Sequence, residues 1–191
     1  MFTVTNVPEG LTMFRRVFFS LSLIATFAVP SFGQTMKADK EKSKIDFVGK
    51  KSDGKHAGGF KEFKSEVKMD LESPEKSSIT IEIKTDSLWS DDETLTGHLK
   101  NPDFFDVKKY PTMKFESTKV EVSDDKSTII GKLTMLDKTI EVKIPTTNEL
   151  NEKSLTIKAD FKIDRTKWGM NYGKGKVDDE VELKVILMFP R

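Results

Sequence analysis

An alternation of apolar and polar side chains runs through most of this 191-residue chain, and it restricts the fold more than any other feature. Between Leu155 and Ile163 every second residue is apolar, and the residues in between are threonine, lysine or aspartate. A second apolar row runs from Val181 to Phe189. Because successive side chains of a β-strand point to opposite faces of its sheet, each row predicts a strand with one buried face.

Shorter rows of the same kind extend this pattern over the rest of the chain, and with the two long rows they give eight or nine strands. They lie at 43–51, 58–63, 66–71, 79–84, 113–122, 131–135 and 139–144. No regular alternation of helices with strands accompanies them, so a parallel sheet is not expected. We predict an all-β fold whose antiparallel sheet closes into a barrel, because closure removes exposed strand edges.

One short helix is predicted near residues 90–101. Ser90 and Glu93 have the spacing of a capping box, in which each side chain bonds a backbone N–H of the other residue. The two aspartates between them suit the positive end of the helix dipole. The helix should end before Pro102, because proline cannot continue a helix.

The interior of an eight-stranded barrel is just wide enough to be filled by side chains or to hold one slender ligand. The inward rows consist almost entirely of isoleucine, leucine, valine, methionine and phenylalanine, so an occupant should be apolar. Ordinary core packing would use the same residues without a ligand. The residues predicted to line the lumen are Phe115, Leu133, Met135, Ile140, Val142, Ile157, Phe161, Ile163, Leu183 and Val185.

Residues 1–33 carry the features of a secretory signal peptide. A basic pair, Arg15-Arg16, precedes an apolar run at 17–29, and the small residues at 31–33 predict cleavage before Gln34. The apolar run is shorter than the roughly 20 residues that span a bilayer, which makes a membrane anchor the weaker alternative.

These features divide the chain into a processed leader and one globular domain. Residues 1–12 are a dispensable extension of the signal peptide, 34–42 form a polar leader, and 43–191 form the barrel domain. We therefore expect a periplasmic or secreted protein without stable membrane insertion after cleavage.

The composition excludes several classes of protein. The chain has no cysteine, which rules out disulfides, thiolate metal sites and cysteine nucleophiles. Its 32 basic and 31 acidic residues give a formal charge of +1, so it lacks the basic field that attracts nucleic acid. Monomer and homodimer both remain open.

The sequence predicts no metal site, no catalytic residue and no cofactor. Only two histidines are present, and neither lies in a metal-binding spacing. His98 lies near Asp92, Asp103 and Asp106, which leaves open a hydrolase for apolar substrates with His98 as its base. A histidine near a helix end more often caps carbonyls or bonds a neighbouring carboxylate.

Two aromatic features are candidates for one end of the barrel. Phe104 and Phe105 lie in a stiff segment that begins at Pro102. They are candidates both to plug one end of the barrel and to line its entrance for an apolar tail, and the two roles do not exclude each other. Arg165 follows an inward row and precedes Trp168. Its guanidinium group would either face a ligand head group or pair with a carboxylate, of which Asp106 and Asp164 are the candidates.

Four segments resemble the signature segments of the YceI-like family: Gly97–Thr118, Gly131–Val142, Ile163–Met170 and Val177–Leu183. The chain departs mildly from the family pattern, because Asp137 stands where glycine is usual. The resemblance covers essentially the whole chain after the signal peptide. It implies a lipocalin-like, eight-stranded antiparallel barrel in the periplasm or secreted space, in a family associated with stress responses.

The resemblance also implies a function, which is to bind and sequester or transport a long-chain isoprenoid lipid of the polyprenyl phosphate or quinone type. It places the ligand mouth at His98, Phe104, Phe105, Asp106, Arg165 and Trp168. Besides a carrier and a hydrolase, a third class stays open: a filled barrel that serves as an interaction module in the cell envelope. Such a module would have a lumen too small for a chain and an exposed apolar patch.

Overall fold

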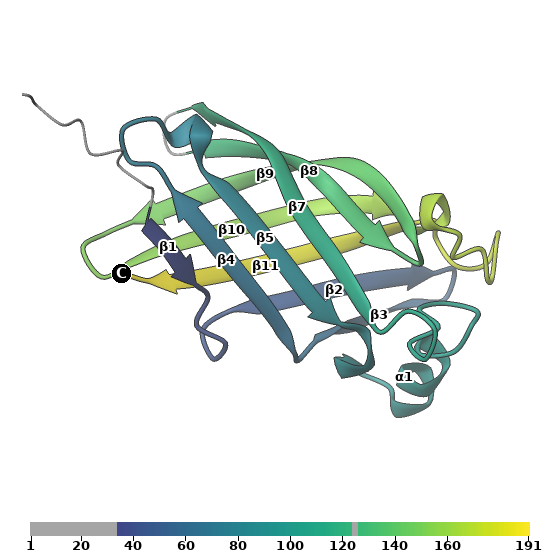
Figure 1. Ribbon diagram of the computed structural model, residues 1–191. Helices are drawn as coiled ribbons and strands as arrows, with labels where there is room; N and C mark the ends of the chain where they lie inside the picture. Colours follow the sequence, from purple (N-terminus) through teal and green to yellow (C-terminus); the bar gives the residue numbers. More distant parts are fainter. Residues whose placement is uncertain (1–33, 124–125) are drawn as a thin grey trace, which may run out of the picture. The chain divides into compact units, whose positions relative to one another are not determined.

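The computed structural model describes residues 34–123 and 126–191, so the predicted signal peptide and its extension at 1–12 lie outside the described residues. The described chain forms one antiparallel sheet of eleven strands curled around an apolar core (Figure 1), which confirms the predicted all-β class. The strands are β1 (Gln34–Lys37), β2 (Lys44–Lys51), β3 (Gly54–Phe60), β4 (Phe63–Met69), β5 (Ser78–Lys84), β6 (Leu88–Ser90), β7 (Thr112–Ser123), β8 (Lys126–Met135), β9 (Lys138–Leu150), β10 (Ser154–Asp164) and β11 (Glu180–Pro190).

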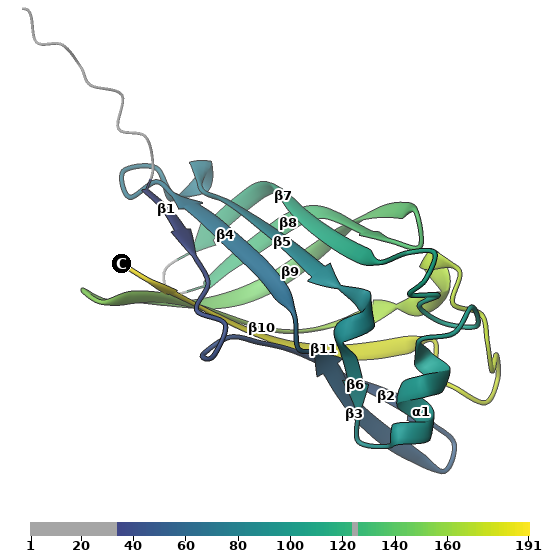
Figure 2. The same cartoon turned by 60° about the horizontal axis from the view of Figure 1, so that its bottom comes forward.

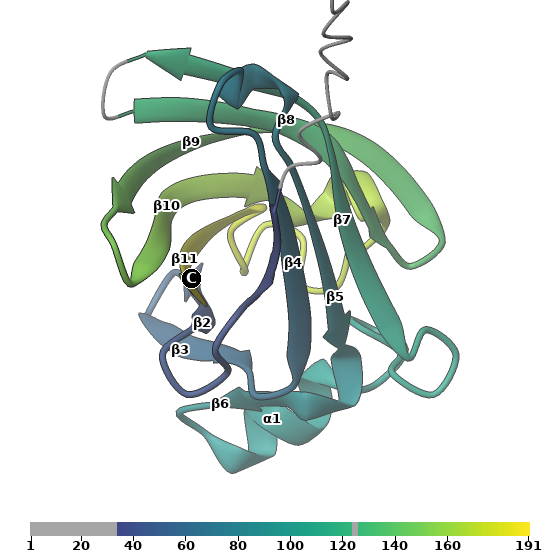
Figure 3. The same ribbon diagram turned by 60° about the vertical axis from the view of Figure 1, so that its left-hand side comes forward.

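The order of the strands in the sheet is β1-β4-β5-β7-β8-β9-β10-β11-β2-β3-β6. The sheet curls so far that β1 comes back to β11: the Asp39 N–H, just after β1, donates to the Met188 carbonyl of β11 at 2.8 Å. Figure 3 shows this curl, with β4 and β5 facing β10 and β11 across the interior. The apolar faces of all the long strands therefore point into one enclosed space.

The structure has more strands than the eight expected for the barrel, and the two that the sequence did not indicate are the shortest. β1 has 4 residues and β6 has 3. Segments this short cannot display an alternating pattern. β1 lies within the predicted polar leader at 34–42, pairs with β4, and buries Met36 in the core.

The chain reverses between β8 and β9 in a two-residue turn, which lies between the apolar rows predicted at 131–135 and 139–144. Met135 pairs with Lys138, and the two residues between them, Leu136 and Asp137, have φ angles of 50° and 58°. Positive φ at both central positions is the conformation of a type I′ hairpin, which glycine and asparagine adopt more easily than leucine or aspartate.

The predicted helix is present but shorter, and its predicted cap is wrong. Helix α1 spans Glu93–Leu99, so it ends before Pro102 as expected. Its N-cap is Asp92, whose carboxylate accepts the Leu95 N–H at 2.7 Å. Ser90 belongs to β6 instead, where its hydroxyl lies 2.9 Å from that of Thr96. An aspartate is as good a cap as a serine, and the end of β6 decides which residue is used.

The two ends of the barrel are built differently. At the helix end, α1 lies beside β6 and β3 (Figure 2), together with the segment 100–111 and the 3-10 helix η3 (Arg165–Trp168). At the hairpin end lie the connection between β4 and β5, which contains the 3-10 helix η1 (Pro74–Lys76), and the ends of β7 and β9. No helix within the described residues is long and apolar enough to span a bilayer.

Replacing Asp137 with glycine should stabilise the fold. The Asp137→Gly variant removes a side chain from a left-handed conformation, and we expect the free energy of unfolding to rise by about 0.5–1 kcal/mol. Urea unfolding followed by circular dichroism measures the change. The matched control is Asp53→Gly, in the two-residue turn between β2 and β3, where φ is not left-handed and glycine should destabilise. A loss of stability in Asp137→Gly would contradict the role given to the turn.

Candidate functional site

The interior of the barrel holds a cavity of about 110 Å³, the lumen, with an almost wholly apolar lining. The one polar lining residue is Thr146, whose hydroxyl donates to the Ser127 carbonyl at 3.2 Å. The other lining residues are Ile45, Phe60, Ile79, Ile81, Ile83, Met113, Phe115, Ile129, Leu133, Met135, Ile144, Ile157, Ala159, Phe161, Leu183, Val185 and Leu187.

Seven of the ten residues predicted to face the lumen line this cavity: Phe115, Leu133, Met135, Ile157, Phe161, Leu183 and Val185. The remaining three, Ile140, Val142 and Ile163, do not line it and instead pack against the core as half-buried side chains. The apolar rows thus predicted most of the lining residues correctly. The alternation shows which face of a strand a side chain lies on, but not how far along the strand the cavity extends.

A second cavity, of about 320 Å³, lies at the hairpin end and shares three lining residues with the lumen: Ile79, Ile129 and Ile157. We call it the hairpin-end opening. Three large apolar side chains on its lining are solvent-exposed: Leu71 by 60%, Leu150 by 49% and Val122 by 46%. The sequence-based mouth prediction names none of them. In the sequence, Leu71 and Val122 look like ordinary ends of apolar rows, and Leu150 lies outside the predicted rows.

The helix end, where the sequence placed the mouth, is closed by side chains. Trp168 is 1% exposed and donates its indole N–H to the Leu133 carbonyl at 3.1 Å. Phe104 is buried, and the ring of Phe105 packs edge-on against Phe60 with centroids 5.6 Å apart. The aromatic segment therefore packs as a plug would. None of the six residues predicted for the mouth lines the lumen or the hairpin-end opening.

Arg165 stabilises the loop that follows η3 through hydrogen bonds to its backbone. It lines neither the lumen nor the hairpin-end opening. The side chain is 4% exposed and donates to the backbone carbonyls of Met170, Val177 and Asp178 at 2.6, 3.1 and 2.9 Å. Its carboxylate partner is Asp179, at 3.8 Å. The ion pair expected with Asp106 or Asp164 is thus wrong, because the sequence does not show that the loop returns to this arginine.

Asp164 and Asp106 have local roles in the backbone. The pKa of Asp164 lies below its usual value, first because its carboxylate accepts the Thr166 hydroxyl and also because it accepts the Thr166 N–H. Asp106 has a φ of 42°, and its carbonyl accepts the N–H groups of Lys109 and Tyr110 in a tight turn. Neither carboxylate lines the lumen or the hairpin-end opening.

His98 lies on the surface of the helix end. Its Nε2 atom is 3.1 Å from the Asp103 carboxylate, and its ring packs edge-on against Phe104 and Tyr172. His98 lines neither the lumen nor the hairpin-end opening. The structure therefore gives this histidine a carboxylate partner and aromatic neighbours, but no enclosed site for an apolar substrate.

The other histidine, His56, also bonds a carboxylate. Its Nδ1 atom is 2.9 Å from Asp91. The pKa of Asp91 is lowered, first by the hydrogen bond from the Ala57 N–H and then by the bond to His56. Within the part of the chain that the structure describes, no group of three or more histidine and carboxylate side chains is arranged to hold a metal ion.

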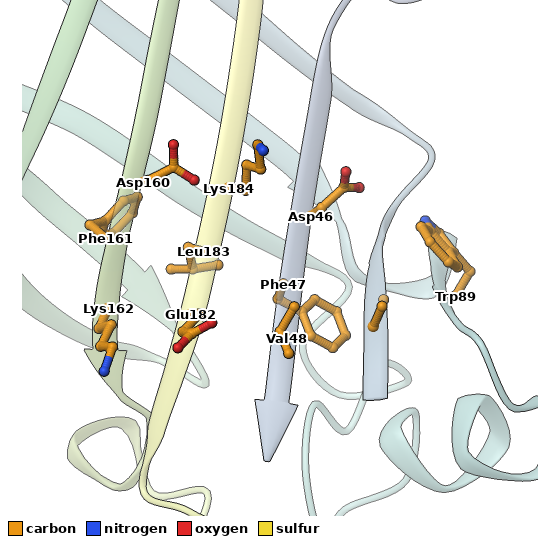
Figure 4. A pocket seen from close by; sticks show the side chains of 12 residues that line it. Asp46, Phe47, Val48, Trp89, Asp160, Phe161, Lys162, Glu182, Leu183 and Lys184 are labelled. Atoms are coloured by element: carbon orange, nitrogen blue, oxygen red, sulfur yellow. The ribbon is translucent and has the colours of Figure 1, made fainter. Parts of the chain in front are cut away.

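A third hollow, of about 510 Å³, lies over β10, β11, β2 and β3 and is bounded by Trp89 of β6 (Figure 4). Charged side chains of both signs contribute to it. Lys184 pairs in register with Asp160 on one side and with Asp46 on the other. A mixed, solvated charge row of this kind does not suit an apolar ligand.

The sequence matches the model of the YceI-like domain over residues 36–189. The chain belongs to the YceI-like family. Family membership accounts for the curled antiparallel sheet and for the four signature segments between Gly97 and Leu183, and it confirms the resemblance stated above.

Relatives and solved structures place the chain more closely. A "UPF0312 protein" of Pseudomonas putida strain F1 is 37% identical over 139 residues, which cover 64% of this chain and 67% of the relative. BcnA of Burkholderia cenocepacia has a similar structure, with a TM-score of 0.75, 29% identity, and coverage of 79% of this chain and 98% of BcnA. A polyisoprenoid binding domain of Saccharophagus degradans shares the fold, with a TM-score of 0.63, 11% identity, and coverage of 82% of this chain and 99% of that domain.

Removing the Arg165 guanidinium should strongly destabilise the fold. In Arg165→Met the buried carbonyls lose their donors, and we expect the free energy of unfolding to fall by about 3 kcal/mol. Arg191→Met is the matched control, because Arg191 is exposed and donates to a carbonyl only at 3.3 Å, so its loss should be below about 0.5 kcal/mol. Urea unfolding measures both changes in the free energy of unfolding. Equal losses in the two variants would show that Arg165 does not stabilise the loop.

Proposed function

We propose that this protein binds and carries a long-chain isoprenoid lipid, of the polyprenyl phosphate or isoprenoid quinone type, with its tail in the lumen. The lumen carries the proposal, because all but one of its lining residues are apolar and three of them also line the hairpin-end opening. The fold shared with a polyisoprenoid binding domain of Saccharophagus degradans supports the same function.

The affinity would come from burial of the tail. Removing apolar surface from water contributes about 25 cal/mol per Å², so a long prenyl chain binds without a specific polar contact. Selectivity would then follow the length of the tail more than the identity of its head group.

The tail must displace side chains to enter. The lumen of about 110 Å³ is smaller than the roughly 300–1,000 Å³ of usual small-molecule sites, so a long chain requires the interior to widen. Met113 and Met135 line the lumen, and methionine has three rotatable side-chain bonds that adapt to irregular shapes. We propose that rotation of these side chains makes room for the tail.

A filled barrel that serves as an interaction module is the second candidate function. The small lumen and the exposed apolar side chains Leu71, Val122 and Leu150 favour it. The hydrolase alternative has no comparable support, since His98 lines neither the lumen nor the hairpin-end opening. The carrier and the module differ in one measurable property, which is whether an apolar molecule occupies the interior.

Blocking the lumen should abolish lipid binding. Ala159 lines the cavity, and Ala159→Leu should fill it at a cost of about 1–3 kcal/mol in stability. Native mass spectrometry with lipid extraction, on protein purified from an exporting host, should find an isoprenoid lipid in the wild type and none in the variant. The control is Thr156→Leu, an equally large side chain on the other face of β10, which should retain the lipid. If preparations and added prenyl lipids never give a bound apolar molecule, the protein is not a carrier.

We further propose that the protein acts in the periplasm or outside the cell after cleavage before Gln34. The basic pair and apolar run in the first 33 residues support this location. Expression of the full chain in a Gram-negative host should give a periplasmic protein. Its intact mass should equal that of a chain that begins at Gln34. The control is a chain with both arginines at 15 and 16 changed to glutamate, which should reduce export. A protein that stays uncleaved in the cytoplasm would contradict the proposed location.

A further inference from the structure

The wall of the barrel is not hydrogen-bonded along its whole length between β9 and β10. We propose that residues 138–146 of β9 and 159–164 of β10 form a lateral seam, along which the wall parts so that the interior widens. The seam is a property of the wall, so it goes beyond the proposed function and beyond the rotation of side chains in the lumen. Only its use during the entry of a ligand rests on the proposed function.

The hydrogen-bonded ladder between β9 and β10 is much shorter than either strand. It joins residues 155–158 of β10 to residues 147–150 of β9. Beyond this ladder, β9 continues to pair with β8 as far as Lys138, and β10 continues to pair with β11 as far as Asp164. The sheet therefore consists of two halves that meet at a ladder of four residue pairs. The halves are β1-β4-β5-β7-β8-β9 and β10-β11-β2-β3-β6.

The side chains along the seam explain why the ladder stops. Continuing the same register would bring a proline and two pairs of like charges into the ladder. Proline has no N–H to donate to a neighbouring strand, and like charges directly opposite each other destabilise a pair of strands. The pairs concerned are Pro145 with Asp160, Lys143 with Lys162, and Glu141 with Asp164. The sequence itself thus opposes closure of the seam.

Apolar side chains along the seam are incompletely covered. Ile140, Val142 and Ile163 belong to inward rows, but they are only half-buried. They line neither the lumen nor the hairpin-end opening, so their exposed surface faces neither space. On the outer face, Lys162 forms its ion pair with Glu180 of β11, on its own side of the seam. The seam thus lacks the ladder that joins the other long strands of the sheet.

The two halves of the sheet also meet where β1 comes back to β11, and this second contact is tighter. The Asp39 N–H donates to the Met188 carbonyl there at 2.8 Å. The inward residues Leu187 and Phe189 of β11 are at most 1% exposed, and Met36 of β1 is buried as well. Elements with few buried contacts and few backbone hydrogen bonds open at a lower cost in free energy. The seam is therefore the contact that parts more easily.

A hydrogen bond connects the two halves at the helix end. The 3-10 helix η3 follows β10 directly, and its Trp168 donates the indole N–H to the Leu133 carbonyl of β8 at 3.1 Å. The seam thus lies between this bond and the ladder of four pairs at the hairpin end, and the wall can bow outward between them. Ile144 and Phe161 belong to the seam and also line the lumen, so outward movement enlarges the lumen directly.

The test changes a charge that opposes closure. Lys143→Glu places a carboxylate across the seam from Lys162, and opposite charges should draw β9 and β10 together. We expect amide hydrogen exchange in the stretch 138–146, measured by NMR on the purified protein, to slow by about fivefold. Exchange in the ladder between β10 and β11 should not change.

The matched control is Lys143→Glu/Lys162→Gln, which carries the same charge reversal without a lysine across the seam. Lys162 is exposed, so the loss of its ion pair with Glu180 should have little effect on stability. Amide exchange in this double variant should stay within about twofold of the wild type.

The same variants test whether the interior widens at the seam. N-phenyl-1-naphthylamine is an uncharged apolar fluorophore whose emission rises in an apolar site, and stopped-flow fluorescence measures its rate of entry. We expect Lys143→Glu to slow entry by about fivefold and the double variant to restore the rate of the wild type.

The two readouts separate the seam from the proposed function. Unchanged amide exchange in Lys143→Glu, or equal slowing in the double variant, would overturn the seam. Slower exchange with an unchanged rate of entry would overturn its role in widening. If the fluorophore does not enter the wild-type protein, the proposed function fails together with the use of the seam during entry. Amide exchange still decides in that case whether the seam parts.

Discussion

The barrel depends on one constraint: the apolar row of every long strand must face the inside of the same curled sheet. β10 and β11 show how register achieves this, because they pair along their whole length and bring Ala159 opposite Val185 and Ile157 opposite Leu187. A shift of one residue would turn each of these side chains to the solvent. The core and the apolar lining of the lumen both follow from this register.

The two ends of the barrel differ in how their described residues pack. At the helix end, Trp168 fills the interior and Arg165 holds the loop after η3 by three backbone carbonyls. The hairpin-end opening is lined mostly by apolar side chains, three of which are exposed. An apolar interior beside such an opening suits a ligand with one apolar end and one polar end, since the polar end can remain near water.

The apolar rows predicted the lining of the lumen well because side-chain direction in a strand is a local property. The rows also predicted that Ile140, Val142 and Ile163 line the lumen, and this prediction was wrong. Tertiary packing around the cavity sets where its lining ends. Ile140 pairs with Leu133, which does line the lumen, so the two side chains lie on the same face of the sheet. The face of a strand therefore does not show by itself how far along the strand the cavity extends.

The sequence by itself determined the all-β class, the antiparallel pairing, the apolar nature of the interior, the short helix and the family. Each of these features is indicated by the alternation of apolar and polar residues or by a short motif, and both kinds of signal extend over only a few residues. Only the tertiary structure decided which end of the barrel is closed. Phe104, Trp168 and Arg165 fit equally well at an open mouth or in a plug until the loop at 170–179 returns to Arg165. That choice depends on contacts between distant segments, for which the order of residues carries no direct signal.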